Sequence, residues 1–559
     1  MVDFHSKKIE FLLKAGISFF ILLLINQLFS LFYFRIDLTE DKRYTFSQAS
    51  KEILKTMPHE MRIDVYLEGK MPAGFLRLRN QIEENLKEIN MLSDGKASYH
   101  FIDPSAEPNR KRRNQLYLEL ARKGIQPTNT FDTKGDEKKE KLLFPGAVLH
   151  YQGHELAVEF LKGNKSLSPQ QQLNQSVENI EYTLISAIRQ ISQVRKKRIG
   201  YMSDNPKNPK AQAFRSAIRQ QYVLTDLNAK KLLKSNPDAV VVTELRRPLS
   251  EAAIFQLDQY VMKGGKVLFL IDKINVAFDS IFQSQALAFP KETGLESLLF
   301  KYGLRINADL VQDLNSGAIP VVVGQMGGQP NIQLVKWPYL VIANRFGGHS
   351  ITKNMDAVFL RFASSLDTVK SSGITKTPLL MSSRHSKRLQ APVDISMNAL
   401  KKDFKPESFN QGNKVFAYLA EGQFPSVFRN RFLPEGYEGT KVIPQSKKTS
   451  IIVVGDSDIM LAEKNPKSGE YEKLGKDPYT KLTFANEDFL MNALAYLTEG
   501  KKLMQARAKT IRIRQLDALR IKEERTFWQA FNLLLPLAFL LLFGSAKYFL
   551  RKRKYTRFK

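Results

Sequence analysis

The residues with the clearest chemical potential are two aspartates at the end of an apolar run. Asp456 and Asp458 follow residues 450–454, which read as a buried strand. Ligands of α/β proteins bind beyond the carboxyl ends of strands, and two carboxylates on one loop are suitable ligands for a hard cation. Aspartate also caps helices and forms turns, and that structural explanation stays open. Asp456 and Asp458 are therefore candidate metal or catalytic carboxylates.

A glycine-rich segment, residues 324–330, follows three consecutive valines and invites comparison with a phosphate-binding loop. It lacks the lysine of such loops, and residues 331–335 look like a strand, not the helix that a phosphate site needs. We therefore expect a tight structural loop or a loop that docks a partner. The candidate contact residues are Gly324, Gly327, Gly328 and Trp337.

Several kinds of chemistry are excluded by what the chain lacks. Cysteine is absent, so disulfides, thiolate metal sites and cysteine nucleophiles are impossible. The sequence contains no Gly-x-x-x-x-Gly-Lys-Ser/Thr phosphate loop, no His-Glu-x-x-His motif and no Gly-x-Ser-x-Gly elbow. We therefore predict that the protein is not an enzyme and holds no cofactor.

Both ends of the chain carry an uncharged segment of bilayer length. Residues 15–34 and 526–546 each form a run of about 20 residues, which as a helix reaches about 30 Å. A cleaved signal peptide is the alternative for the first run, but residues 30–34 are large where a cleavage site needs small side chains. A buried core helix is the alternative for the second. We predict two transmembrane helices.

Lysine and arginine set the orientation of these spans. Residues 547–559 contain seven bases and no acid, which places them in the cytoplasm by the positive-inside rule. With two spans in a bacterial inner membrane, residues 1–14 are cytoplasmic as well and residues 36–525 are periplasmic. The net charge is +29, from 85 Lys and Arg against 56 Asp and Glu. A basic exterior suits anionic lipid, an acidic polymer or an acidic partner, or it consists of ordinary solvated faces; nucleic acid is not expected there.

The predicted exterior begins with an α/β domain, residues 47–192. Strands and helices alternate in the order βαβαββα, with a hairpin of residues 146–151 and 155–160. This order resembles a thioredoxin-like fold, and Pro145 stands where that fold keeps a cis-proline. Without cysteine it would be a binding version of the fold.

Residues 196–500 predict a doubly wound α/β region. Apolar strands at 239–243 and 266–271 flank a helix that begins after Ser250 and ends at Gly264. Residues 377–381 and 450–454 are further strands of the same sheet or of a companion domain. Residues 501–525 predict a charged helical stalk that leads into the second span.

The combination of several segments resembles a known family. The resemblance spans nearly the whole chain, and no single piece is specific. It is carried by residues 35–47, 310–314, the 324–330 loop with Trp337-Pro338-Tyr339, residues 362–369, and residues 421–428 followed by Asn430-Arg431. The chain is similar in these segments to the gliding-motility-associated ABC-transporter accessory (substrate-binding-like) proteins of Bacteroidota, the GldG family.

The resemblance implies a periplasmic, substrate-binding-like subunit that works with a separate membrane permease and a separate cytoplasmic ATPase. It also implies that the middle domain is similar to the fold of class I glutamine amidotransferases, whose nucleophilic cysteine this chain cannot supply. No ligand residues are carried over from the family.

Two alternatives remain beside a non-enzymatic transporter subunit. The exterior could be an enzyme that acts on envelope polymers through Asp456 and Asp458, or a purely structural envelope scaffold. The sequence names neither a cargo nor a direction of transport.

Overall fold

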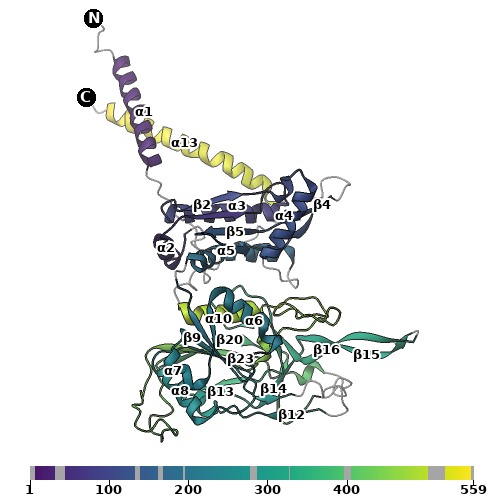
Figure 1. Ribbon diagram of the computed structural model, residues 1–559. Coiled ribbons are helices and arrows are strands. Elements are labelled where there is room, and N and C mark those ends of the chain that lie inside the picture. The colour runs from purple at the N-terminus through teal and green to yellow at the C-terminus, as the bar shows by residue number, and fades with distance from the viewer. Residues whose placement is uncertain are drawn as a thin grey trace. The chain divides into compact units, whose positions relative to one another are not determined.

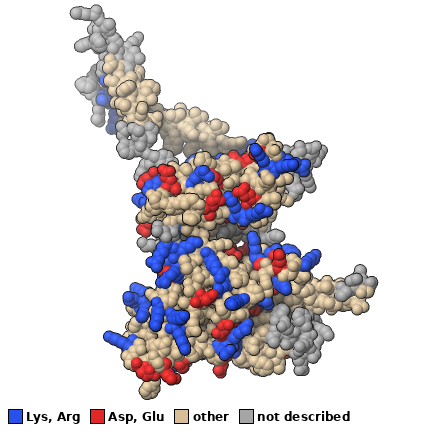
Figure 2. Space-filling view, in the orientation of Figure 1, with Lys and Arg blue, Asp and Glu red and all other residues tan. Residues whose placement is uncertain are grey.

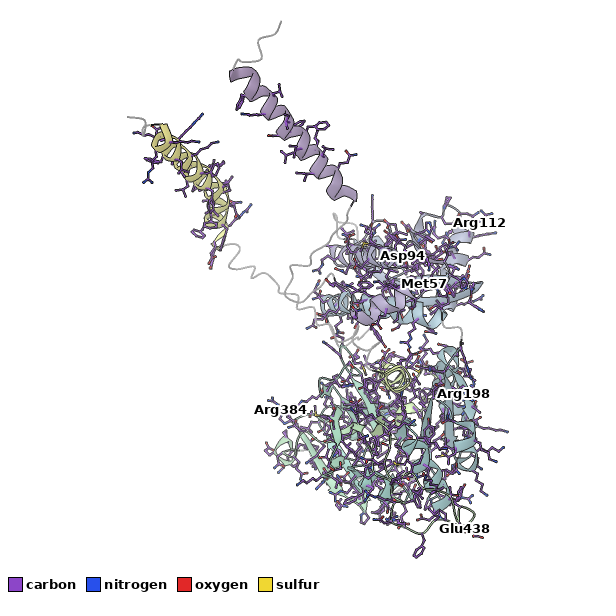
Figure 3. The ribbon with its side chains drawn as sticks, turned by 90° about the vertical axis from the view of Figure 1, so that its left-hand side faces the viewer. Met57, Asp94, Arg112, Arg198, Arg384 and Glu438 are labelled. Carbon is purple, nitrogen blue, oxygen red and sulfur yellow. The ribbon has the colours of Figure 1, made fainter. Side chains whose placement is uncertain are left out.

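The computed structural model describes residues 7–31, 45–132, 139–161, 168–192, 195–276, 286–326, 328–395, 405–500 and 523–555. The chain divides into two units, Met1–Lys509 and Thr510–Lys559. In the first unit, Met57, Asp94 and Arg112 mark the smaller sheet domain, and Arg198, Arg384 and Glu438 mark the larger one (Figure 3).

The smaller domain is built on a four-stranded sheet of order β2-β1-β5-β6 (Figure 1). The strands are β1 (Met61–Val65), β2 (Ala97–Phe101), β5 (Gly146–Tyr151) and β6 (His154–Glu159). β1 runs parallel to β2 and antiparallel to β5. The predicted hairpin is confirmed, because Gln152 and Gly153 both have positive φ, as a two-residue turn between β5 and β6 requires.

Helices cover this sheet and complete its core. They are α2 (Gln48–Lys55), α3 (Ala73–Leu92), the short η1 (Pro104–Ala106), α4 (Arg110–Lys123) and α5 (Pro169–Ser192). A separate ribbon, β3 (Thr128–Asp132) with β4 (Lys139–Leu143), was not predicted. Ile82 of α3 and Ile185 of α5 are fully buried with Ile63 of β1 in one apolar cluster.

Pro145 departs from the sequence expectation. The cis peptide bond found among the described residues is Ala391–Pro392, so the Phe144–Pro145 bond is trans. The carbonyl of Pro145 accepts the Phe160 N–H at 2.8 Å, which ties it into the edge of the β5–β6 hairpin.

The larger domain is organised by a ten-stranded mixed sheet, whose main path has the order β13-β19-β23-β24-β10-β9-β7-β8. β20 pairs with β23, and β17 pairs with β20. The parallel strands are β7 (Arg198–Ser203), β8 (Val223–Asp226), β9 (Ala239–Thr243), β10 (Val267–Leu270) and β24 (Thr449–Val454). The antiparallel strands are β13 (Leu304–Ile306), β17 (Arg345–Phe346), β19 (Leu366–Thr368), β20 (Ile374–Met381) and β23 (Val415–Gly422).

Helices on both faces make β9 and β24 buried along their whole length, which explains their unbroken apolar sequences. α6 (Gln212–Gln221) and α10 (Asn486–Glu499) share one apolar cluster with this sheet, and α8 (Glu251–Met262) and α9 (Glu296–Lys301) share the other. The short helices are η2 (Pro209–Ala211), η3 (Ala229–Lys231), α7 (Leu232–Ser235), η6 (Pro406–Ser408) and η7 (Asp458–Met460). The predicted mixed α/β architecture is confirmed.

Local signals placed α8 correctly. Ser250 Oγ accepts the Ala253 N–H at 3.3 Å as an N-cap, and Gly264 has φ +96 just after the helix.

Small β-elements lie beside the large sheet. They are β11 (Ile274–Asn275), β12 (Leu287–Pro290) and β22 (Val393–Asp394); β14 (Asp309–Asp313) with β21 (Ser386–Gln390); and β15 (Ser316–Met326), β16 (Gln329–Ala343) and β18 (Val358–Arg361). Together they enclose a further apolar cluster around Trp337 and Leu310.

Each terminal region contains an apolar helix. α13 (Arg525–Tyr555) includes a segment, Arg525–Lys554, that is long and apolar enough to cross a membrane and has no buried residue. α1 (Lys7–Leu31) contains a shorter apolar segment, Leu13–Gln27. Most of the predicted stalk, residues 501–522, and most of the 35–47 segment lie outside the described residues.

Candidate functional site

The carboxyl edge of the large sheet collects four carboxylates. β9, β10 and β24 are parallel neighbours, so the residues that follow them meet at one edge. Glu244 follows β9, Asp272 follows β10, and Asp456 and Asp458 follow β24. The sequence singled out only the last pair. Asp272 and Glu244 carry the same signal, an acid directly after an apolar strand, but only the strand order shows that they share an edge.

Asp456 is committed to the backbone around it. It is 1% exposed, and its Oδ2 accepts the Arg361 N–H at 2.8 Å while its Oδ1 accepts the Asp458 N–H at 2.7 Å. Burial raises the pKa of Asp456 well above its usual value, and the nearby charges of Asp458 and Asp272 raise it further. The arrangement is that of an aspartate that holds the turn into η7.

Asp458 is the member of the group that faces a cavity. Burial raises its pKa to about 6, the charge of Asp272 adds to the rise, and the charges of Arg361 and Lys210 oppose it. The cavity beside it has a volume of about 140 Å³ and is also lined by Arg361 and by Glu463, which form an ion pair. Asp458 is therefore a carboxyl group with a raised pKa that lies near the guanidinium of Arg361.

Asp272 braces the same loop from the neighbouring strand. Its Oδ1 accepts the Ser457 N–H at 2.6 Å, and its Oδ2 accepts the Ser457 hydroxyl. Among the residues that the structure describes, no group of three or more His, Asp or Glu side chains is arranged to hold a metal ion. These hydrogen bonds explain Asp456 and Asp272 as residues that stabilise the loop after β24.

A second feature of this edge is a topological switch point. β8 is added on one side of β7 and the next strand, β9, on the other side, so the strand order reverses between β7 and β9. Glu244 lies there with φ +46, and it accepts hydrogen bonds from Asn208 Nδ2 at 2.5 Å and from Ser203 Oγ at 3.3 Å. Burial raises its pKa. A cleft of about 740 Å³ adjoins it, and its charged lining is balanced between Asp204, Asp226, Arg246 and Arg247.

The glycine-rich segment forms the outer part of a two-stranded ribbon, β15–β16, that projects from the larger domain (Figure 1). Gly324 lies at a bulge in β15, Gly328 has φ +79 in the turn, and Gly327 lies outside the described residues. The strand predicted after the loop is confirmed as part of β16. A phosphate cradle needs a helix N-terminus there, and a strand follows instead.

One face of this ribbon is apolar and exposed. Val322 pairs with Ile332 and Pro320 pairs with Leu334, so all four side chains lie on the same face. Val322 and Ile332 are each 61% exposed and Leu334 is 50% exposed. Residues 316–335 contain no charged residue, and Figure 2 shows the ribbon without blue or red atoms. It is a surface for contact, not for ionic chemistry.

Trp337 lies at the base of the ribbon and not on its surface. It is 1% exposed and makes edge-to-face contacts with Tyr339 and Phe362, with ring centroids 5.9 and 5.4 Å away. The structure thus separates Trp337, a core residue, from the exposed Gly324 and Gly328, with which the sequence had grouped it.

The described chain thus contains a mixed α/β domain, in which Asp456 and Asp272 hold loops at the carboxyl edge, and a helix long and apolar enough to cross a membrane. A family model described as an ABC-type uncharacterized transport system (ABC_transp_aux) matches residues 196–493, more than half of the chain. The chain belongs to this family of transport-system auxiliary components. A second model, a domain of unknown function (DUF7088), matches residues 40–150.

Individual relatives add little to this family assignment. An uncharacterized protein of Borreliella burgdorferi is 21% identical over 558 residues, which cover 97% of this chain and 98% of the relative. Among solved structures, the mmIFT52 N-terminal domain aligns over 54% of this chain and 97% of its own at 12% identity, with a TM-score of 0.29. That likeness is too low to carry an argument.

Proposed function

We propose that this protein is a non-catalytic, membrane-anchored subunit of an ABC transporter complex that works with a separate permease and a separate cytoplasmic ATPase. The observation that carries the proposal is the presence, in one chain, of a transport-system auxiliary domain and of a helix long and apolar enough to cross a membrane. Asp456 and Asp272 support a non-catalytic role, since their oxygens already accept hydrogen bonds from backbone and hydroxyl groups.

The proposed topology has two spans with both termini in the cytoplasm and residues 36–525 in the periplasm of a bacterial inner membrane. α13 supplies the second span, and its last turn is basic, with Lys552, Arg553 and Lys554. α1 supplies the first span, and its apolar segment is supported by exposed leucine, isoleucine and phenylalanine side chains. Reporter fusions after residue 559 should read cytoplasmic, and fusions near residue 300 should read periplasmic.

The proposal extends to the folds of the two domains. A thioredoxin-like fold of residues 47–192 is supported by the sheet order β2-β1-β5-β6 with its parallel first pair, although Pro145 lacks the cis bond. A glutamine-amidotransferase-like fold of residues 196–500 is supported by parallel strands covered on both faces. The proposed association with gliding motility rests on the sequence resemblance alone. It is tested by deleting the gene in a gliding bacterium that encodes this chain and measuring colony spreading.

The ribbon is the surface through which this subunit contacts the extracytoplasmic part of the permease. Its exposed face and uncharged length suit an apolar protein surface. A second copy is a poor occupant, because two chains of net charge +29 repel one another.

Affinity purification of the tagged full chain in a mild detergent tests both the proposed subunit role and the proposed contact between the ribbon and the permease. The expected result is co-isolation of one ATPase and one permease, with ATP hydrolysis by the preparation. A Val322→Ser/Ile332→Ser variant should lose most of the permease, whereas Leu118→Ser, at a similarly exposed leucine (60%) on α4, should retain it. Recovery of this chain without transporter subunits contradicts the proposed function. Equal recovery by both variants contradicts only the role of the ribbon.

A further inference from the structure

A cavity of about 420 Å³ shares no lining residue with the carboxyl-edge group described above, although Lys273 directly follows Asp272 of that group. It is bounded by residues of α9, β13 and β21, by the loop after β10, and by the loops that precede α9 and β14. The charged residues of its lining are Lys273, Glu296, Arg305 and Arg388. Three cationic side chains and one carboxylate thus face a space of the size that small organic ligands occupy.

Arg305 and Arg388 each form an ion pair with a carboxylate that does not line the cavity. Arg388 Nε lies 3.5 Å from Asp309 Oδ2, and Arg305 Nη2 lies 2.9 Å from Asp367 Oδ2. Each contact uses one edge of a guanidinium group and leaves further N–H donors of its planar fork. The side chains of Arg305 and Arg388 are 57% and 40% exposed, so these donors are accessible.

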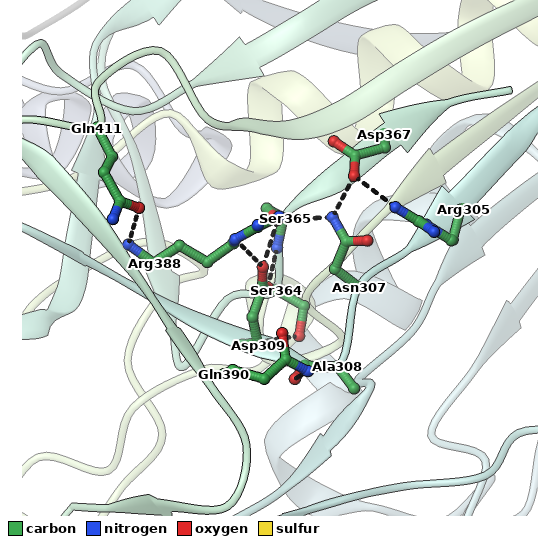
Figure 4. A network of polar contacts seen from close by, with 10 residues as sticks. All are labelled: Arg305, Asn307, Ala308, Asp309, Ser364, Ser365, Asp367, Arg388, Gln390 and Gln411. Atoms are coloured by element: carbon green, nitrogen blue, oxygen red, sulfur yellow. Dashed lines mark hydrogen bonds and ion pairs between the residues drawn. The ribbon is translucent and has the colours of Figure 1, made fainter.

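A continuous polar network fixes the positions of these arginines (Figure 4). Asp309 is fully buried and also accepts the Ser365 N–H at 2.8 Å and the Ser365 hydroxyl at 2.6 Å. Asn307 Nδ2 donates to Ser365 Oγ and to Asp367 Oδ2, both at 2.9 Å, and so connects the two ends. A network of this kind orients charged side chains for a ligand.

The third cation is positioned by the lining carboxylate. Lys273 Nζ lies 2.5 Å from Glu296 Oε1, which also accepts the Thr293 N–H at 3.0 Å. Burial alone would raise the pKa of Glu296, but these contacts outweigh it and lower the pKa to about 2. Glu296 therefore stays ionised and keeps Lys273 at the cavity.

The rest of the lining indicates what kind of molecule fits. Leu299, Phe300 and Ile306 are the larger apolar residues of the lining, and Asn307 and Gln390 contribute amide groups. Two arginine forks are matched to the paired oxygens of a carboxylate or a phosphate group.

We propose that this cavity binds a small organic anion, a carboxylate or a phosphate ester with hydroxyl groups, through Arg305 and Arg388. The site is not needed for the proposed subunit role, so either can fail without the other. It would make this chain the component that senses or delivers a solute.

Isothermal titration of the purified full chain in a non-ionic detergent tests the proposal. The probes are glucuronate, glucose 6-phosphate, inorganic phosphate and, as the neutral control, glucose. We expect one of the two sugar anions to bind with a Kd below about 1 mM and glucose not to bind. The carboxylate and the phosphate arms distinguish the two anion types, and saturation by inorganic phosphate alone would contradict the organic part of the proposal.

Three variants locate the binding. Arg305→Gln should weaken it at least about tenfold, since one charge-assisted contact is lost and the partner Asp367 stays solvated. Arg388→Gln should weaken it at least as much; if it fails to fold because Asp309 is buried, Arg305→Gln alone decides. Arg429→Gln, at an exposed arginine outside the cavity, should bind like the parent. No saturable binding of any anion, or equal affinity in Arg305→Gln and Arg429→Gln, overturns the proposal.

Discussion

The carboxyl edge of the large sheet and the β15–β16 ribbon are the two regions whose residue types suggested a function, and they are built in opposite ways. At the edge, Asp456 is 1% exposed and both of its oxygens accept backbone N–H groups. On the ribbon, Val322 and Ile332 are 61% exposed. At the carboxyl edge, where reactive acids were predicted, the carboxylate oxygens of Asp456 already have hydrogen-bond partners. On the ribbon, where a tight loop was predicted, apolar side chains are exposed to solvent.

This contrast in burial indicates which of the two regions is suited to contact other molecules. A buried carboxylate whose hydrogen-bond partners all lie in the same chain stabilises a loop. Removing the carboxylate leaves buried N–H donors without an acceptor. An exposed apolar strand face costs free energy in water and is retained where another surface covers it.

The largest effect is expected at the base of the ribbon. Trp337→Ala should lower the free energy of unfolding by about 3–5 kcal/mol, because a fully buried indole is replaced by a cavity. Trp337→Phe should cost less. The chain has only two tryptophans, so loss of the buried component of the fluorescence reports the change directly. An unaltered denaturation midpoint in Trp337→Ala would show that this cluster is not a core.

At the carboxyl edge, Asp456→Ala should cost about 2–3 kcal/mol, since the N–H groups of Arg361 and Asp458 lose their acceptor. The measurement is the denaturation midpoint together with hydrogen exchange of the residue 456–461 loop. ATP hydrolysis by the isolated complex should persist at the temperature where the variant is folded. A folded variant that has lost a catalytic turnover on envelope polymers would instead support an enzyme.

A smaller effect concerns pH. The folded-state pKa of Asp458, about 6, lies above its usual 3.8, so between these values the folded protein binds more protons than the unfolded one. The contribution of Asp458 to stability is therefore full below about pH 4 and is lost as the pH rises to about 6. Asp458→Asn should lack this pH-dependent loss, so its free energy of unfolding should rise relative to that of the parent as the pH increases from about 4 to about 6. Asp94→Asn, at an exposed turn, is the control and should show no such gain; a parallel pH curve for Asp458→Asn would contradict the assignment.

The smallest effect on stability is expected on the outer ribbon. Val322→Ser/Ile332→Ser should change the free energy of unfolding by less than about 0.5 kcal/mol, since both side chains are already in water. Thermal denaturation of the purified chain measures this. A loss of more than about 2 kcal/mol would mean that the ribbon is packed within this chain and is not a docking surface.

Local signals made part of the fold predictable. Ser250 and Gly264 bound α8 because a cap and a positive-φ glycine act over a few residues. The strands β9, β10 and β24 were visible as apolar runs because helices cover both of their faces. The ribbon was seen only in part, since its exposed strands lack the alternation of a half-buried sheet.

Long-range pairing was the part that sequence could not supply. Asp272 and Asp456 meet because β10 and β24 are neighbours, and nothing local records that adjacency. The same holds for Arg388 and Asp309, which approach through the β14–β21 pairing. Two membrane spans were predicted from composition; α13 is long and apolar enough to be one of them, whereas α1 contains only a shorter apolar segment, Leu13–Gln27.

The pairing of Val267 in β10 with Ile451 in β24 has a consequence for how the chain is made. β9 finds both of its neighbours, β7 and β10, by residue 270, but β10 has one edge unpaired until the segment near residue 451 has been synthesised. Closing so long a loop is slow, and an exposed apolar edge in the meantime invites misassembly.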